Sequence, residues 1–350
     1  MIIFIVIIGL SLLILFHELG HFFVAKLSGM RVDEFGIGFP PRIWGKKIGN
    51  TLYSVNALPF GGFVKIAGEN GNEKEGQKQE DIFTSKPIWK RSAVILAGVT
   101  MNFIIGWFAL SAVFVVGIPE HLMISDVAND SPAAIAGIEQ GDVVLRATHN
   151  KFVLTDPIPL DDFISSVKTS YESDVKLEIQ RGSEIVTVSL RGRETPPVGE
   201  GSLGIGLVEI GAAPLPFFTG ILEGFLTAGA FLGTMISFFI EFFSKVFVDP
   251  SIVKNVAGPV GIVSIASQAG SLGLVYLINL FAIISLNLTV LNLIPFPALD
   301  GGRFVLLIVE KIKGSPLSTR VQQVVNAFGF VVLIALMVVV TIQDIGKLLS

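Results

Sequence analysis

The most constraining feature of the sequence is the stretch "LILFHELGHFFVAKLSG" at residues 13–29, which places ionisable side chains inside an apolar run. The run from residue 2 to residue 26 is long enough to cross the hydrocarbon core of a bilayer, which is about 30 Å thick. Ionisable groups are costly at that depth and mark functional sites. His17, Glu18 and His21 therefore indicate a reactive centre within a membrane helix.

The whole chain has the composition of a membrane protein with a soluble insert. Of its 350 residues, 51% are hydrophobic and only 15% are charged, whereas soluble domains average about 25% charged residues. The net charge of -4, without a basic stripe, argues against a nucleic-acid partner. The absence of cysteine excludes disulfides and thiolate metal sites. The first helix lacks the basic start and the cleavage site of a signal peptide, so we expect it to be retained.

Five apolar segments are candidates for crossing the membrane, and we expect four of them to cross. The four expected spans are close to 2–26, 92–117, 275–296 and 324–342. The doubtful fifth segment is 217–247. Residues 26–91 carry eleven Lys and Arg, whereas residues 118–216 carry seven against fifteen Asp and Glu. Because cytoplasmic loops are enriched in Lys and Arg, the first stretch is predicted to be cytoplasmic and the second extracytoplasmic.

The basic stretch contains a segment that favours β-structure over a spanning helix. Residues 36–66 are rich in Gly, Pro and β-forming residues, with turn signals at Gly49-Asn50 and Gly61-Gly62. We predict a short, membrane-associated β-hairpin here, followed by a solvated loop at 67–82.

The acidic block at 118–208 is predicted to be a small αβ domain. It begins with a strand, a helix, a turn and a second strand, and residues 174–192 alternate apolar and polar side chains as a β-hairpin does. The stretch "SPAAIAGIEQGDVVL" at 131–145 resembles part of a PDZ domain. A generic αβ insert is the alternative.

The motif HExxH at residues 17–21 has a spacing that suits zinc. Residues four apart lie on one face of a helix, so His17 and His21 can both reach one Zn²⁺ at about 2.0–2.1 Å. Glu18 is placed to act as general base for a zinc-activated water that attacks a peptide carbonyl. The alternative is a pair of core histidines satisfied by hydrogen bonds. That alternative does not explain why three ionisable residues, each costly to place in lipid, lie together in an apolar span.

Catalytic zinc usually has three protein ligands, so a third ligand is expected from a carboxylate beside another span. Asp300 follows an apolar helix that ends in prolines, and Gly301-Gly302 let the backbone turn there. His121 and His149 lie in the extracytoplasmic block and are not expected to reach the site. Asp300 could instead cap the helix that follows it, but beside an incomplete zinc site we favour the ligand role.

With these motifs in place, the chain resembles the site-2 protease family of intramembrane zinc metalloproteases, and more narrowly the bacterial regulator of sigma-E protease group. The matching stretches are "HELGH" (17–21), "FGIGFPPRIWG" (35–45), "ALPFGGFVKI" (57–66), "KPIWKRSAVILAGVTMNF" (86–103), "NVAGPVGIVSIA" (255–266) and "NLIPFPALDGG" (292–302). One feature departs from the enterobacterial form, which has two tandem PDZ domains, because residues 118–208 hold only one.

The resemblance implies a zinc-dependent endopeptidase of the bacterial inner membrane. Its expected substrates are single-span membrane proteins, such as an anti-sigma factor or remnant signal peptides, which it would cleave within the bilayer during a stress response. A catalytically silent homologue that only binds membrane proteins is the alternative. The intact Glu18 argues against that alternative.

The resemblance also assigns roles to individual residues. His17, His21 and Asp300 would hold Zn²⁺ and Glu18 would be the base. Asn292 would contact the substrate backbone or help to polarise its carbonyl. Gly36 and Gly38 would belong to a re-entrant β-element that holds the substrate extended, and Asn255 would begin a substrate-handling loop.

Bringing His17 and Asp300 together sets the expected topology. If the first helix runs inward from an extracytoplasmic N-terminus, the helix before Asp300 must also run inward. Segment 217–247 should then lie on or dip into the outer membrane surface, and the active site should lie toward the cytoplasmic side.

We therefore expect a polytopic α-helical membrane protein with four transmembrane helices, a β-hairpin element and an inserted PDZ-like domain. The expected parts are a membrane core at 1–117 and 275–350, the PDZ-like domain at 118–208, and a surface helix with a substrate-handling loop at 209–274.

Overall fold

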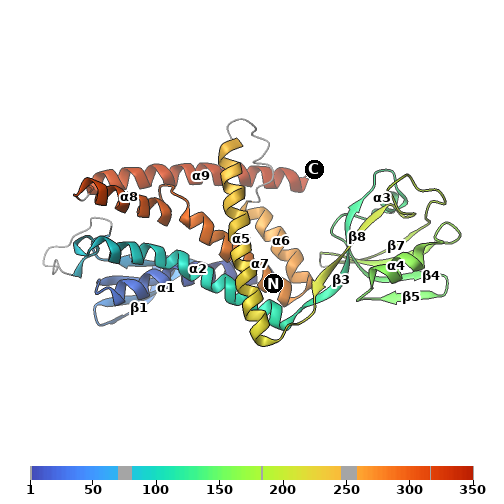
Figure 1. The fold of residues 1–350 in the computed structure, drawn as a ribbon, viewed down its shortest axis with the longest axis horizontal. Helices are drawn as coiled ribbons and strands as arrows, with labels where there is room; N and C mark the ends of the chain where they lie inside the picture. Colours follow the sequence, from blue (N-terminus) through green and yellow to red (C-terminus); the bar gives the residue numbers. More distant parts are fainter. Residues whose placement is uncertain (1, 70–80, 183, 246–257, 316, 350) are drawn as a thin grey trace. The chain divides into compact units, whose positions relative to one another are not determined.

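The computed structural model of the chain describes residues 2–69, 81–182, 184–245, 258–315 and 317–349. The chain divides into two compact units, whose elements are labelled in Figure 1. The membrane unit contains Met1–Ala112, Ile221–Ala269 and Leu277–Ser350. The αβ unit contains Val113–Gly220 and Gly270–Tyr276.

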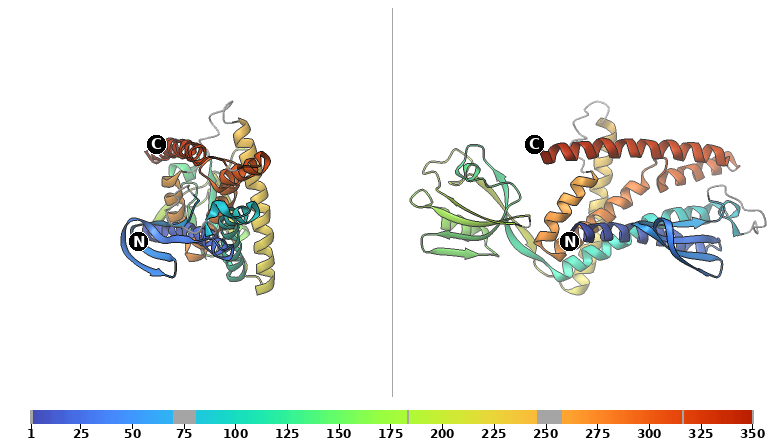
Figure 2. Two further views of the ribbon diagram at one scale, coloured as in Figure 1. Left: turned by 90° about the vertical axis from the view of Figure 1, so that its left-hand side faces the viewer. Right: turned by 180° about the vertical axis from the view of Figure 1, so that it is seen from behind.

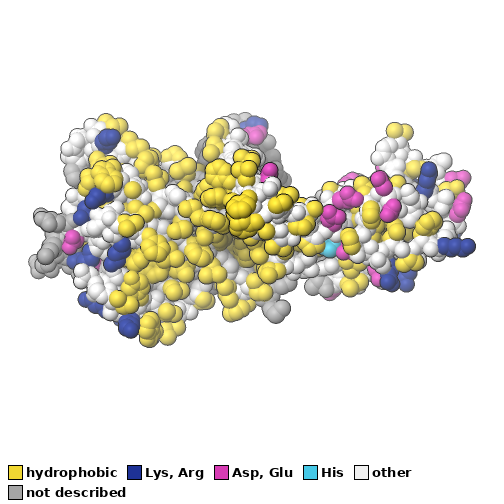
Figure 3. All heavy atoms as spheres, turned by 60° about the horizontal axis from the view of Figure 1, so that its bottom comes forward, with side chains coloured by type: hydrophobic (Ala, Val, Ile, Leu, Met, Phe, Trp, Pro, Cys, Tyr) yellow, Lys and Arg dark blue, Asp and Glu magenta, His cyan; other side chains and the backbone are white. Residues whose placement is uncertain are grey.

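Long helices build the membrane unit. Their bounds are α1 (Ile2–Leu27), α2 (Ile88–Val116), α5 (Phe217–Lys245), α6 (Pro259–Leu272), α7 (Leu274–Leu293), α8 (Asp300–Lys313) and α9 (Thr319–Leu349), with a 3-10 turn η2 at Phe83–Ser85. Among the described residues, α1, α2, α5, α7 and α9 contain stretches long and apolar enough to cross a membrane. Figure 3 shows apolar side chains over much of one face of this unit. The prediction of several long apolar helices is confirmed, but length and composition do not separate α5 from the four expected spans.

Helix α5 packs against its neighbours differently from the other long helices. Helices α1 and α2 lie side by side, whereas α5 crosses their direction in the views of Figures 1 and 2. The crossing with α2 is close, because a Cβ atom on Gly224 would lie 2.8 Å from the backbone nitrogen of Ser111. Trp107 Nε1 donates a hydrogen bond of 3.0 Å to the Ile221 carbonyl at the same crossing. Small residues on α5 thus allow this helix to lie across α2.

The hairpin predicted between α1 and α2 is present, but it is longer than expected and folds back on itself. Strands β1 (Val32–Ile48) and β2 (Thr51–Ile66) join at the Gly49-Asn50 turn. Phe35 pairs with both Tyr53 and Val64, so its segment has a neighbour on each side. Four short segments therefore lie side by side in the order 42–48, 51–56, 32–37 and 62–66.

Gly61 lies where β2 changes from one side of β1 to the other. Its φ is +79°, a conformation that residues with a Cβ rarely adopt, and a Cβ there would lie 2.7 Å from Ile14 Cγ2 on α1. The Gly61-Gly62 signal thus marks a change of strand partner beside α1 rather than the end of the hairpin.

The αβ unit is one antiparallel sheet with two short helices. Its elements are β3 (Ile118–Val127), α3 (Pro132–Ile135), β4 (Val143–His149), β5 (Phe152–Thr155), α4 (Leu160–Val167), β6 (Val175–Arg181), β7 (Glu184–Leu190) and β8 (Ile205–Ala212). The strand order is β7-β6-β4-β3-β8, and β5 pairs with β4. Leu122, Ile124, Phe163 and Leu177 are fully buried in its core. The predicted order of strand, helix, turn and strand is confirmed.

Candidate metal centre

Helix α1 carries the two histidines of the HExxH motif on one face. Their rings meet edge to face with centroids 4.7 Å apart, and their Nε2 atoms are separated by 3.1 Å. His21 is buried, and its Nδ1 atom lies 2.8 Å from the carbonyl oxygen of Val94 on α2. That contact orients the His21 ring and leaves its Nε2 atom pointing at His17.

Asp300 reaches the same point from a distant part of the sequence. Helix α7 ends at Leu293, a proline-containing turn follows, and Asp300 is the first residue of α8. Its Oδ2 atom lies 3.2 Å from His17 Nε2 and 3.3 Å from His21 Nε2. The N-cap position belongs to Leu299, so Asp300 does not cap α8.

Two glycines allow the turn before α8 to fold this tightly. A Cβ atom on Gly301 would overlap the carbonyl oxygen of Ile294, and one on Gly302 would overlap that of Phe296. The backbone of α8 therefore packs directly on the turn that precedes it. This packing places the Asp300 carboxylate against the histidines.

The three side chains fit a metal ion. Among the described residues, His17, His21 and Asp300 form a cluster whose ligand atoms all lie within 4.8 Å of one another. A tetrahedral Zn²⁺ with bonds of about 2.0–2.1 Å holds its ligand atoms about 3.3 Å apart, which is close to the 3.1, 3.2 and 3.3 Å separations here. Asp300 Oδ2 is also buried, and among the described residues only these two imidazoles lie close enough to interact with it. A buried carboxylate oxygen that faces two imidazoles is the arrangement expected of a ligand set.

The electrostatics of the cluster keep the carboxylate ionised. Burial raises the pKa of Asp300, but the hydrogen-bonding and charge interactions with His17 and His21 lower it by more, so its pKa is below the ordinary range. An ionised carboxylate is the form that binds a metal ion.

Glu18 is held by the hairpin. Its Oε2 atom accepts a hydrogen bond of 3.0 Å from the backbone N–H of Val64 on β2. Because this N–H points to α1, it points away from the β1 segment that pairs with Val64 on the other side. Glu18, the candidate general base, therefore lies against an outer edge of the folded-back sheet, and residues 62–66 form that edge.

Gly98 on α2 leaves room for the cluster. A Cβ atom at this position would overlap His21 Nε2 and lie 2.6 Å from His17 Cε1. Sequence reasoning did not single out Gly98, nor the backbone groups of Val94 and Val64. A glycine in the middle of an apolar helix was the available signal for Gly98, whereas nothing in the sequence distinguishes a backbone donor or acceptor.

The predicted substrate-handling residues are placed as follows. Gly36 and Gly38 are buried in β1, and the Asn56 side chain donates a 3.1 Å hydrogen bond to the Gly38 carbonyl. Asn292 is half-buried in the last turn of α7. Asn255 lies outside the described residues.

The other two histidines belong to the αβ unit, as expected. His121 Nδ1 contacts the Asp156 carboxylate at 2.8 Å, and buried His149 Nδ1 contacts the Ser166 carbonyl at 2.6 Å. Neither residue belongs to the cluster of His17, His21 and Asp300.

Comparison with known proteins agrees with this chemistry. The model of peptidase family M50 matches residues 5–336. A Clostridium perfringens protein named a "putative zinc metalloprotease" is 36% identical over 96% of both chains. A Nostoc protein of the same description is 32% identical over 97% of this chain and 94% of its own. The Bacillus subtilis "Regulator of sigma-W protease RasP" is 27% identical over 96% of both chains.

Proposed function

Since the chain belongs to peptidase family M50 and is a zinc metalloprotease of the membrane, we propose that it cleaves peptide bonds within transmembrane segments of single-span membrane proteins. The observation that carries this proposal is the position of the cluster. His17 and His21 lie within α1, an apolar helix long enough to span a bilayer, and Asp300 lies against them. A hydrolytic centre at that depth suits a substrate that is itself in the membrane.

In the proposed mechanism, His17, His21 and Asp300 would hold Zn²⁺, which would supply Lewis-acid activation at this site. Glu18 takes the proton from the attacking water and passes it to the leaving amine. The hydrogen bond from the Val64 N–H fixes the Glu18 carboxylate beside the ligands.

The substrate must be extended before it is cut, because the amides of a transmembrane helix are hydrogen-bonded within the helix. We propose that the unwound segment pairs with the sheet edge at 62–66 by strand addition. Gly36 is an inner position, since it already has a partner on each side, Phe63 and Ser54, whereas the 62–66 edge lies beside Glu18 through the Val64 hydrogen bond. Gly36 and Gly38 would then shape the sheet, Asn292 would contact the substrate backbone, and the segment beginning at Asn255 would help to handle the substrate.

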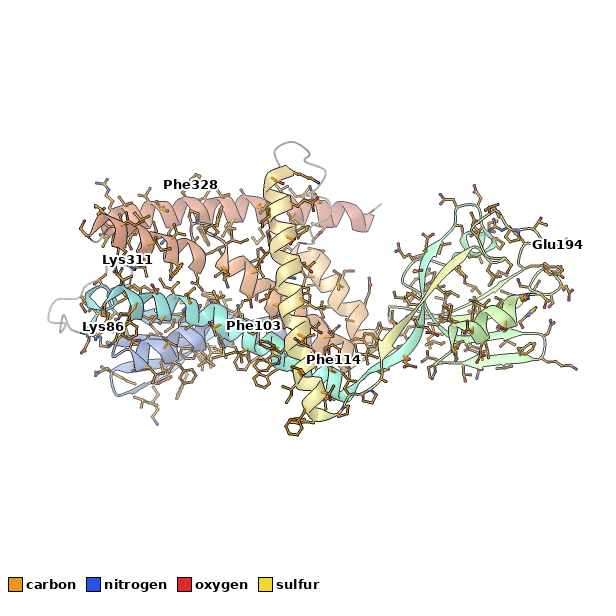
Figure 4. All side chains as sticks on the ribbon, viewed as in Figure 1. Lys86, Phe103, Phe114, Glu194, Lys311 and Phe328 are labelled. Carbon is orange, nitrogen blue, oxygen red and sulfur yellow. The ribbon has the colours of Figure 1, made fainter. Side chains whose placement is uncertain are left out.

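The proposed topology has four transmembrane helices, α1, α2, α7 and α9, in a bacterial inner membrane. Lys86 before α2 and Lys311 at the end of α8 lie at the same end of the membrane unit in Figure 4, which supports a cytoplasmic location for that end. The N-terminus and the αβ unit would be extracytoplasmic. Helix α5 would lie at the outer surface, which is supported by its course across α2. A cysteine at Lys245 should then react with an impermeant reagent from outside; reaction from the cytoplasmic side only would contradict this topology.

The αβ unit is proposed to be a PDZ-like domain that controls access of substrates. Anti-sigma factors and remnant signal peptides are the proposed substrates, and a stress response is the proposed setting. The name of the Bacillus subtilis relative, "Regulator of sigma-W protease RasP", supports the first substrate class.

The test is cleavage of a reconstituted single-span substrate in proteoliposomes. The wild-type protein should cut within the transmembrane segment, and a zinc chelator should stop the reaction. Glu18→Gln should lower the rate by about 10²–10⁴-fold, the usual contribution of a general base, while zinc stays bound. Equal rates for Glu18→Gln and wild type would refute the proposed role of Glu18. Equal cutting of poly-leucine and glycine-containing segments would refute the need for unwinding.

A further inference from the structure

The two histidines of the metal centre differ in what holds their second ring nitrogen. A metal-bound histidine almost always donates its other N–H to a carboxylate, a carbonyl or a water, which fixes the tautomer and the ring orientation. Val94 provides that partner for His21. His17 Nδ1 is buried and has no hydrogen-bond partner among the described residues. Within the part of the chain that the structure describes, no protein group therefore supports His17 from its second ring nitrogen.

Asn102 is a second buried polar group without a partner. The residue is 1% exposed, and both its Nδ2 and Oδ1 atoms are buried with no hydrogen bond to the described residues. Asn102 directly precedes Phe103, which Figure 4 labels in the middle of α2. Burial of an amide with neither atom satisfied is rare and costly, so a missing partner such as an ordered water is expected.

The two orphaned groups lie along the same contact between α1 and α2. Val94, Gly98 and Asn102 are spaced four residues apart and so follow one face of α2. Helices α1 and α2 run in opposite directions at this contact. Val94 contacts His21, whereas Gly98, one turn later on α2, lies against both His21 and His17. Asn102 is one further turn along, on the side toward His17.

Helix geometry points the Asn102 side chain back toward this contact. The Cα–Cβ bond of a helical residue tilts toward the N-terminus of its helix, so Asn102 covers the turn that contains Gly98. Gly98 has no side chain to fill that space, and His17 Cε1, which is bonded to Nδ1, borders it. On the α7 side, Ser285 Oγ donates to the Asn102 backbone carbonyl at 2.8 Å and leaves the side-chain amide unsatisfied.

We propose that Asn102 is a positioning residue for the metal centre and acts on His17 through one buried water. The water accepts a hydrogen bond from His17 Nδ1–H and donates one to Asn102 Oδ1. This arrangement keeps the proton on Nδ1 and leaves Nε2 free to bind Zn²⁺. The inference rests on the proposed ligation of Zn²⁺ by His17.

The test compares zinc release with stability in the full-length protein in detergent. Asn102→Leu removes the amide and keeps the volume. Zinc transfer to a chromogenic chelator should become about 10–100-fold faster, the usual cost of losing such a support. The thermal midpoint should not fall, because an unsatisfied buried amide has been removed. Asn326→Leu is the matched control, because Asn326 Oδ1 is also buried without a partner in the described part of the chain but lies on α9. Zinc release from this control should equal wild type.

Zinc release from Asn102→Leu at the wild-type rate would overturn the inference. So would equal acceleration in Asn326→Leu, since that would reflect a general effect of the substitution. If the leucine variant does not fold, Asn102→Met provides the same comparison and is judged by the same outcomes. His17→Ala separates the two proposals: if it keeps zinc as wild type does, the proposed ligand set fails, whereas normal zinc release by Asn102→Leu alone removes only the role of Asn102.

Discussion

Arg91 on α2 and Glu310 on α8 form a buried ion pair, with Arg91 Nη1 2.7 Å from Glu310 Oε2. Glu310 also accepts hydrogen bonds from the Leu317 N–H and the Gln322 side chain, so it joins α8 to α9 as well. Both paired helices support the metal centre, α2 through the Val94 carbonyl and α8 through Asp300. The pair therefore holds together two helices that must keep a fixed spacing.

Loss of the charge on Glu310 should destabilise the membrane unit. Glu310→Gln leaves the Arg91 guanidinium buried without a counter-charge, and breaking such a pair costs about 3–5 kcal/mol. Thermal unfolding in detergent would show a lower midpoint. Lys311→Gln on the same helix is the control, since Lys311 is exposed, and it should unfold as wild type does. Equal midpoints for the two variants would contradict the prediction.

A side chain at Gly98 should displace the proposed zinc ligands. In Gly98→Ala the new methyl group overlaps His21 Nε2, so we expect zinc content after dialysis to fall well below one ion per chain. The control is Gly229→Ala on α5, where a Cβ would meet nothing within 4 Å. Full zinc occupancy in Gly98→Ala would show that the helices can move apart at this point.

Removal of one backbone N–H should weaken catalysis without loss of zinc. Val64→Pro deletes the donor that holds Glu18, and proline is tolerated on an edge strand whose N–H points away from its partner. We expect cleavage to slow by about tenfold, the equivalent of roughly 1.4 kcal/mol, with zinc still bound. Val64→Ala keeps the N–H and should remain close to wild type. Comparable activity in both variants would remove any role for this hydrogen bond.

In the αβ unit, Arg181 should contribute more to stability than its partly exposed position suggests. It bonds the carboxylate of Asp142, which is 1% exposed, and also the Gly137 carbonyl. Arg181→Met leaves that carboxylate unpaired and should cost about 2 kcal/mol, the range for a hydrogen bond to a charged group. Arg191→Met is the control, because the Arg191–Asp174 pair is exposed and such pairs contribute about 0–1 kcal/mol. Urea unfolding monitored by far-ultraviolet circular dichroism would compare the free energies of unfolding of the two variants. A larger loss of stability in Arg191→Met than in Arg181→Met would contradict the assignment.

The chemistry of the centre was predictable because it depends on side-chain types and spacing. HExxH has few other uses in an apolar helix, and a zinc site with two histidines requires a third ligand, which led to Asp300. The cluster of His17, His21 and Asp300 has the geometry that this reasoning expected. The ligand role itself stays a prediction until zinc is measured.

The supports of the centre could not be predicted from the same sequence. The Val94 carbonyl and the Val64 N–H are backbone groups that every residue has, so only the packing of α1 against α2 and β2 selects them. Phe35 pairs with two segments because β2 passes from one side of β1 to the other near Gly61. In the sequence, the Gly61-Gly62 signal indicated only a turn. For α5, hydropathy reports the free energy of transfer of the segment out of water. It does not report the direction of the helix axis, so it could not predict how α5 lies against α2.

The separation of the ligands along the chain has a consequence during synthesis. The two histidines leave the ribosome early, and Asp300 follows His21 by 279 residues. Until α8 has been made and packed, the nascent chain has only two of the three side chains needed for a hydrolytic zinc site. With Asp300 as the proposed third ligand, the chain would lack a complete metal site until α8 is made, and a product truncated before Asp300 would lack it as well.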